Sequence, residues 1–164
     1  MQVIFIRHGS AEPAGQAGDA ARGLTDAGRR EVRTTCQALK ALGVRLQRVL
    51  SSPLTRAMQT GELIAEAFEA HGPDEVGFLV QPGDFQEMTA VLADMLAEEV
   101  SAVGLVGHSP SLGKLLGELI AGRPDVGVSL SNAGAACVAL AGDQKAELCW
   151  LMQRGQLAIL APKA

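Results

Sequence analysis

The chain alternates between short runs rich in apolar residues and longer segments in which apolar residues recur every three or four positions. The short runs predict strands, and the first of them, Val3 to Ile6, has the composition of a strand that is buried on both faces of a parallel sheet. They lie at residues 3–6, 48–51, 76–80, 102–106, 135–140 and 147–152. The last two are joined through Gly142 and Asp143, which predicts a closing antiparallel hairpin at one edge of the sheet.

Four segments with the helical spacing of apolar residues lie between these strands. We expect helices from Thr25 to Gly43, from Pro53 to Gly72, after the turn Pro82-Gly83-Asp84, and from Pro110 to Gly122. Ser52 and Ser109 are expected to cap the two helices that begin with proline. Strands that alternate with helices predict an α/β fold. We expect a three-layer α/β/α sandwich with a largely parallel central sheet, formed by residues 1–164 as a single domain.

Composition and charge narrow the class of protein. The chain has 164 residues, of which 48% are hydrophobic and 20% charged, so it can bury a core without a metal or a disulfide. Its 14 Lys and Arg against 18 Asp and Glu give a net charge of −4, which argues against a general nucleic-acid or anionic-membrane surface. Cys36, Cys137 and Cys149 form no CxxC pair, and we expect all three to be small core residues.

The amino-terminal apolar run favours a strand over a targeting segment. It is short, has no basic residue before it and stops at Arg7, unlike a secretory signal peptide. No apolar stretch approaches the roughly 20 residues that span a bilayer. We therefore expect a soluble cytoplasmic protein.

Candidate chemistry gathers where predicted strands end. In open α/β sheets, ligands bind outside the carboxyl ends of the strands. Arg7 and His8 follow the first strand directly, and His108 follows a later one. Residues 10–23 lack periodicity and predict a long surface loop that covers this region. His71, at the end of a predicted helix, is expected to be solvated and without a role.

A bound anion would explain the positions of both Arg56 and His108. Arg56 lies in the first turn of its predicted helix, where free backbone N–H groups already carry positive partial charge. An arginine is unfavourable there unless an anion such as phosphate shares the site. His108 precedes another helix, whose dipole disfavours the imidazolium form unless an anion lies beside it.

Each of these signals also has a structural explanation when it is taken alone. Arg56 could be an exposed residue that interacts with Gln59 or Glu62. His8 or His108 could be a hydrogen-bonded structural histidine. Because all the groups fall at strand-to-helix junctions on one predicted edge of the sheet, together they predict a site for a phosphoryl group.

Other chemistries fit the sequence less well. The segment Gly107-His108-Ser109-Pro110-Ser111 is similar to the G-x-S-x-G elbow of serine hydrolases. Its fifth residue is Ser111 rather than glycine, and no histidine follows His108 to complete a triad. No Walker A sequence or G-x-G-x-x-G is present, and no histidines or cysteines stand at metal-ligand spacing, so we expect no cofactor and no metal.

Four groups of residues form a combination that is more specific than any one of them. They are Val3-Ile4-Phe5-Ile6 followed by Arg7-His8-Gly9, Leu24-Thr25 with Gly28, Ser52-Pro53 with Arg56, Ala57 and Thr60, and Gly107-His108. The combination resembles the histidine phosphatase superfamily, also called the phosphoglycerate-mutase-like or RHG family. The short length and the turn at residues 81–84 look most similar to SixA-type protein phosphohistidine phosphatases.

The resemblance implies a role for each of four residues. His8 is the nucleophile that becomes transiently phosphorylated, Arg7 and Arg56 hold the phosphoryl oxygens, and His108 completes the cradle. Two guanidinium groups and a second imidazole can stabilise a phosphoryl transition state without a metal. The partner implied is a phosphorylated protein, either a histidine-phosphorylated carrier or a phosphorelay domain, with no nucleic acid and no membrane.

The sequence departs from the family at the residue that protonates the leaving group. Many members place a carboxylic acid after the third strand, where this chain has Phe78-Leu79-Val80. Imidazole, with a pKa of about 6.5, leaves without a general acid, whereas an alkoxide does not. The missing acid therefore favours a phosphohistidine substrate. Asp84 and Glu12 are the weak candidates for a replacement, and Asp84 is better explained as a helix N-cap.

Two alternatives stay open beside the phosphohistidine phosphatase. A small-molecule phosphomonoesterase of the same superfamily is favoured if Asp84 or Glu12 points at the phosphate. A phosphoprotein-binding module without turnover would need only the arginines, so the presence of His8 argues against it.

Overall fold

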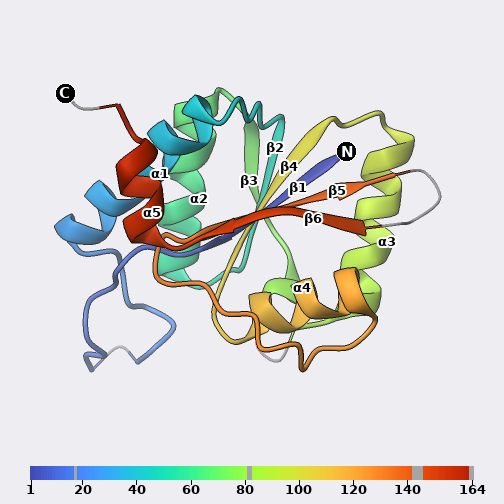
Figure 1. Cartoon of the computed structure of the whole chain (residues 1–164). Coiled ribbons are helices and arrows are strands. Elements are labelled where there is room, and N and C mark those ends of the chain that lie inside the picture. Colours follow the sequence, from blue (N-terminus) through green and yellow to red (C-terminus); the bar gives the residue numbers. More distant parts are fainter. Residues whose placement is uncertain (17, 81–82, 142–145, 163–164) are drawn as a thin grey trace.

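A computed structural model of the chain describes residues 1–16, 18–80, 83–141 and 146–162 (Figure 1). Its helices and strands alternate along most of the chain, as the hydrophobic pattern predicts. In chain order they are β1 Gln2–Arg7, α1 Asp26–Ala41, β2 Arg48–Ser51, α2 Thr55–Phe68, β3 His71–Glu75, the 3₁₀ helix η1 Gly77–Leu79, α3 Phe85–Ala97, β4 Ala102–Gly107, α4 Ser111–Ala121, β5 Ala135–Leu140, β6 Ala146–Met152 and α5 Arg154–Leu160.

The strands form one sheet in the order β3-β2-β4-β1-β5-β6. β1 is parallel to β4 on one side and antiparallel to β5 on the other, and β2 is parallel to both β3 and β4. The antiparallel pair β5 and β6 closes one edge. This confirms the largely parallel sheet with a carboxyl-terminal hairpin, whose connecting residues Gly142 and Asp143 lie outside the described residues.

Helices cover both faces of the sheet and confirm the three-layer sandwich. Figure 1 shows α1, α2 and α5 on one face and α3 and α4 on the other. Alternate residues of β1 divide between the two layers, since Ile4 and Ile6 pack under the first group of helices and Val3 and Phe5 under the second. β1 is therefore buried on both faces, and its carboxyl end delivers the next residues to the edge where α/β sheets bind ligands.

The prediction that Ser52 and Ser109 cap α2 and α4 is wrong. The two helices begin later, at Thr55 and Ser111, and neither has a side-chain cap. The Ser52 hydroxyl lies 2.8 Å from Nε2 of His108, and that of Ser109 donates to a backbone carbonyl group. Both hydroxyls thus contact distant segments, and that of Ser52 also accepts from the backbone N–H of Leu54 at 3.4 Å.

The predicted strand at 76–80 is also wrong. The strand at this edge is His71–Glu75, a polar and partly exposed segment, and α2 ends at Phe68 rather than at Gly72. Phe78 and Leu79 lie in η1 with no exposed surface, because their side chains complete the core beneath α3 and α4. These two residues are apolar because they are buried, and not because they lie in a strand.

Two of the three cysteines lie in the core. Cys36 and Cys137 are buried as predicted, whereas Cys149 is exposed on the edge strand β6 and is not a core residue.

Among the described residues, no helix combines the length and the apolar character that crossing a membrane requires. The short carboxyl-terminal helix α5 was not predicted, since it buries only Leu157.

Candidate active site

Three of the four predicted site residues are in direct contact at the carboxyl edge of the sheet. His8 follows β1, His108 follows β4, and Arg56 is the second residue of α2. The ring centroids of His8 and His108 are 5.0 Å apart, and Nε of Arg56 donates to Nε2 of His8 at 3.3 Å. All three side chains are buried. Residues separated by up to 100 positions in the chain thus converge because β1 and β4 are neighbours in the sheet.

The contacts of His8 define its neutral tautomer. Its Nδ1 lies 2.7 Å from the carbonyl oxygen of Gly9. A carbonyl oxygen only accepts, so Nδ1 carries the proton and donates it. Nε2 therefore holds the lone pair, in agreement with the N–H of Arg56 that is directed at it. An imidazole in this state presents a nucleophilic nitrogen beside a guanidinium group.

His108 has one partnered and one unpartnered nitrogen. Nε2 is 2.8 Å from the hydroxyl of Ser52, which explains why that serine does not cap α2. Nδ1 is buried and has no hydrogen-bond partner among the residues that the structure describes. Buried polar atoms are normally satisfied, and one that is not points to a bound ligand. Nε of Arg7 is likewise buried and has no hydrogen-bond partner within the described residues.

Burial keeps both histidines neutral at physiological pH. Desolvation, with smaller contributions from Arg56, Arg7 and Arg22, lowers the pKa of His8 to about 4. Desolvation, followed by repulsion between the two rings if both were protonated and by the charge of Arg56, lowers the pKa of His108 to about 3. Arginines lie beside two neutral imidazoles, and the Asp19 carboxylate, which contacts Arg56 at 3.0 Å, is 60% exposed, so the site suits an oxyanion.

Arg7 is held against the back of the site by the loop before β5. Its Nη1 donates to the carbonyl oxygen of Leu130 at 2.8 Å. The backbone N–H of Ala133 approaches the carbonyl oxygens of both Arg7 and His8 at 3.1 Å, and the Thr35 hydroxyl donates to the carbonyl of Ala133 at 2.8 Å. The backbone that carries Arg7 and His8 is thus tied to both β5 and α1.

Sequence reasoning missed Asp19 and Arg22, which the loop at 10–23 brings to Arg56. The two terminal nitrogens of Arg56 donate to the backbone oxygen of Asp19 at 2.8 Å and to its carboxylate at 3.0 Å. Arg22 donates to the other carboxylate oxygen at 2.8 Å. The prediction of a covering loop is consistent with these contacts, but no periodic or motif signal distinguished these two residues within it.

No strong general acid stands at the positions named from the sequence. Phe78 and Leu79 are fully buried apolar side chains. The Asp84 carboxylate accepts from the backbone N–H of Glu87 at 3.0 Å, which confirms it as the N-cap of α3. Hydrogen bonds from Arg22 and Arg56 hold the pKa of Asp19 below its ordinary value, so Asp19 is a poor proton donor. Glu12 is exposed in the loop, and its role stays a prediction.

His71 lies away from this cluster. It is the first residue of β3 rather than the end of a helix, with a side chain that is 66% exposed and 3.4 Å from the carboxylate of Asp74. Across the described ranges, no three His, Cys, Asp or Glu side chains are grouped so that they could hold a metal ion.

We expect the stability of the ligand-free protein to fall as the pH drops from 6.5 toward 4. The unfolded chain protonates its histidines near pH 6.5, whereas the folded protein keeps His8 neutral to about pH 4 and His108 to about pH 3. The stabilisation is therefore complete above pH 6.5 and is lost as the pH falls through this window. Each histidine contributes a slope of at most about 1.4 kcal/mol per pH unit.

Urea unfolding in phosphate-free buffer would measure this slope. The variant His108→Asn should have a shallower pH dependence than the wild-type protein. A wild-type slope that His108→Asn leaves intact would contradict the assignment of a buried neutral imidazole.

The chain is similar in sequence and structure to known proteins. Residues 3–78 match the model of the histidine phosphatase superfamily (branch 1). The chain is 37% identical to the phosphohistidine phosphatase SixA of Escherichia coli (strain K12) over 124 residues, which cover 75% of this chain and 76% of that protein. An uncharacterized protein of Picosynechococcus sp. is 33% identical over 135 residues, 82% of each chain.

The structural comparison agrees with the sequence comparison. The structure of the protein histidine phosphatase SixA complexed with tungstate has a TM-score of 0.86 and 31% identity, and the match covers 96% of this chain and 99% of that one. The family landmarks Arg7, His8, Arg56 and His108 lie together at one edge of this fold. The chain therefore belongs to the histidine phosphatase superfamily and is of the SixA type.

Proposed function

We propose that this SixA-type phosphatase removes the phosphoryl group from phosphohistidine in a protein, through a covalent intermediate on His8. The observation that carries the proposal is the tautomer of His8. Its Nδ1 proton is engaged by the Gly9 carbonyl at 2.7 Å, so Nε2 is unprotonated where Arg56 and His108 meet. A neutral imidazole in this position is ready to attack phosphorus.

In the first step, the Nε2 lone pair of His8 forms a bond to phosphorus. The bond between phosphorus and the substrate imidazole breaks in line, and its electron pair stays on the leaving nitrogen. Negative charge is spread over the three phosphoryl oxygens at this point. Arg56 contacts Nε2 of His8, and Nε of Arg7 and Nδ1 of His108 are buried without a partner among the described residues, so we expect these groups to stabilise that charge.

In the second step, water attacks phosphorus and the bond to Nε2 of His8 breaks. The electron pair returns to the imidazole, the proton of the attacking water goes to the phosphate product, and the neutral histidine is restored. The hydrogen bond from Nδ1 to Gly9 persists through both steps, so the ring does not have to reorient.

The chemistry of the leaving group supports a phosphohistidine substrate. A phosphorylated imidazole whose second nitrogen carries a proton leaves as the neutral ring, whose conjugate acid has a pKa of about 6.5, so the enzyme need not protonate the leaving nitrogen, whereas an alkoxide needs a general acid. The position expected for that acid holds Phe78 and Leu79, and Asp84 caps α3. Transfer from nitrogen to nitrogen also makes the donor and acceptor groups chemically equal, so neither direction of the first step is strongly uphill.

The relatives support the same assignment. The Escherichia coli relative is named a phosphohistidine phosphatase, and the similar solved structure is a SixA complexed with tungstate, a tetrahedral oxyanion like phosphate. A histidine-phosphorylated carrier or a phosphorelay domain is the partner that this chemistry requires. Its phosphorylated side chain would enter at the edge of the sheet beside the loop at 10–23.

We expect phosphohistidine to react at least about 10²-fold faster in kcat/KM than an alkyl phosphate, because general acid catalysis contributes about 10²- to 10⁴-fold and none is provided here. Phosphate release would be measured from a histidine-phosphorylated protein, p-nitrophenyl phosphate and 3-phosphoglycerate. The aryl ester, with its weakly basic leaving group, should fall between the other two.

Two amide variants serve as controls for a hidden acid. Asp84→Asn should keep the N-cap of α3, since Asn caps as well as Asp, and Glu12→Gln conserves shape. Both should keep the rate on phosphohistidine within about twofold, because no step uses their proton. Efficient hydrolysis of 3-phosphoglycerate, lost in either variant, would identify a small-molecule phosphomonoesterase instead. Tight phosphoprotein binding without phosphate release would identify a binding module.

A further inference from the structure

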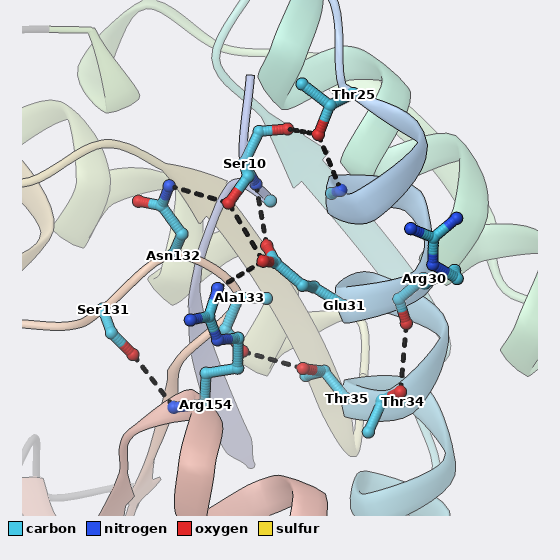
Figure 2. Close-up of polar contacts among 12 residues, drawn as sticks. Ser10, Thr25, Arg30, Glu31, Thr34, Thr35, Ser131, Asn132, Ala133 and Arg154 are labelled. Atoms are coloured by element: carbon cyan, nitrogen blue, oxygen red, sulfur yellow. Dashed lines mark hydrogen bonds and ion pairs between the residues drawn. The ribbon is translucent and has the colours of Figure 1, made fainter. Parts of the chain in front are cut away.

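A carboxylate lies on the far side of the peptide group that holds His8. Figure 2 shows Glu31, on α1, pointing at Ser10 in the segment that follows the site. One carboxylate oxygen of Glu31 accepts from the backbone N–H of Ser10 at 3.0 Å, and the other accepts from its hydroxyl at 3.0 Å. Arg154 of α5 forms an ion pair with the same carboxylate. The Glu31 side chain is only 17% exposed.

The Ser10 N–H and the Gly9 carbonyl belong to one planar peptide group. Its N–H is bound by the Glu31 carboxylate, and its oxygen accepts the Nδ1 proton of His8 at 2.7 Å. Hydrogen bonds in series polarise one another, so an anion at the N–H end makes the carbonyl oxygen a stronger acceptor. The charge of Glu31 is thereby transmitted to the imidazole without direct contact.

We propose that Glu31 is a positioning residue for His8 and acts through the Gly9–Ser10 peptide group. The proposal rests on the proposed function, in which His8 attacks phosphorus. The peptide group takes the place of the direct carboxylate that orients a catalytic histidine in other enzymes. It holds the proton on Nδ1, keeps the lone pair on Nε2, and stabilises the ring as it gains positive character on phosphorylation.

The peptide groups on either side of the Gly9–Ser10 peptide group are hydrogen-bonded as well, which limits its rotation. The Ser10 carbonyl accepts from the backbone N–H of Thr25 at 3.0 Å and from its hydroxyl at 3.2 Å. The Gly9 N–H donates to the Thr60 hydroxyl at 3.2 Å. A Cβ atom at Gly28 would overlap the Ser10 carbonyl oxygen, so only glycine lets α1 approach this closely.

A purely structural role for Glu31 makes a different prediction. If the carboxylate only anchored α5 through Arg154, removing either partner would have the same effect on the enzyme. If it acts through the peptide group, removing Arg154 leaves the contact with Ser10 and the state of His8 intact. Arg154 also makes no contact with His8, Arg56 or His108 among the hydrogen bonds and ion pairs of the described residues, so it is a matched control.

The test compares Glu31→Gln with Arg154→Gln in the full-length protein. Gln has the shape of Glu and can still accept from Ser10, but it lacks the charge. We expect Glu31→Gln to slow the single-turnover phosphorylation of His8 roughly 10-fold or more with KM little changed, as when the partner that orients a ligating histidine is removed. Arg154→Gln should stay within about twofold, and Glu31→Asp should recover part of the lost rate.

A second readout does not depend on activity. In ¹H–¹⁵N NMR spectra of the ligand-free protein, Glu31→Gln should shift the Nδ1–H resonance of His8 upfield, because its hydrogen bond is weaker. Arg154→Gln should leave that resonance in place. Circular dichroism verifies that each variant is folded, and Glu31→Asp provides the comparison if Glu31→Gln is not.

Each outcome decides between a positioning role and a purely structural role for Glu31. A wild-type rate and an unmoved Nδ1–H resonance in Glu31→Gln would overturn the proposal, as would equal losses in Glu31→Gln and Arg154→Gln. A slower rate with an unmoved resonance would also overturn it, because the effect would not pass through His8. If the wild-type enzyme forms no phosphohistidine at residue 8, the proposed function fails, and the NMR comparison still tests the contact between Glu31 and His8.

Discussion

Replacing His8 with alanine should reduce turnover on the order of 10⁶-fold, the size of effect found when a covalent nucleophile is removed from an enzyme. The variant lacks the Nε2 lone pair, and no other imidazole can replace it. His108, the nearest one, has its Nε2 engaged with Ser52, and in the proposed function its Nδ1 binds the phosphoryl oxygens. The measurement is phosphate release from a histidine-phosphorylated protein, together with acid-labile phosphate bound to the enzyme after rapid quenching.

The fold of His8→Ala should be retained. The backbone N–H of His8 donates to the Gly107 carbonyl at 3.1 Å and its carbonyl accepts from Ala133, and neither contact involves the side chain. The control is His71→Ala, which removes an exposed histidine and should leave turnover unchanged. Near wild-type activity in a folded His8→Ala protein would mean that the nucleophile is another residue.

Replacing Arg56 with alanine should reduce kcat/KM roughly 10³-fold or more, by analogy with arginines that stabilise phosphoryl transition states. The side chain is buried with 7% exposure and directs one N–H at Nε2 of His8, where the phosphoryl group would be transferred. Its terminal nitrogens contact Asp19 in the ligand-free protein. When a phosphoryl group is bound, its oxygens compete with Asp19 for these donors.

Two variants show whether the loss is specific to the guanidinium fork. Arg56→Lys keeps a charge but cannot bind two oxygens at once, so it should recover only part of the activity. Arg48→Ala removes a partly exposed arginine whose contact with Glu98 is 3.4 Å long, and it should have little effect. A loss below about tenfold in Arg56→Ala would mean that Arg56 is not a transition-state ligand.

The main features of the site could be predicted because they depend on chain order and on buried strands. A strand buried on both faces must lie inside the sheet, and a residue directly after it must lie at the carboxyl edge. His8 and His108 follow two such strands, so both are predicted at one edge, where the structure has their rings 5.0 Å apart. The role of Arg56 could be predicted from its position in a first helical turn, because an arginine there needs a compensating anion.

The predictions were wrong where an apolar run was interpreted as a strand. Phe78 and Leu79 are apolar because they are buried, yet they lie in a 3₁₀ helix rather than a strand. The strand His71–Glu75 is polar because it lies at the edge of the sheet and is partly exposed, so it has no apolar strand pattern. A hydrophobic run thus reports that a segment is buried, while its neighbours determine the backbone conformation.

Three features could be predicted from the sequence: the alternation of helices and strands, the two helix layers, and the edge of the sheet at which His8, Arg56 and His108 meet. Local periodicity and chain order are sufficient to predict them. Only the tertiary structure decided how the site is held. The contact of Ser52 with His108, of Asp19 with Arg56 and of Glu31 with Ser10 each joins segments that are far apart in the chain. Hydrogen bonds of this kind depend on positions accurate to a few tenths of an ångström, which the packing of whole elements determines and no local pattern records.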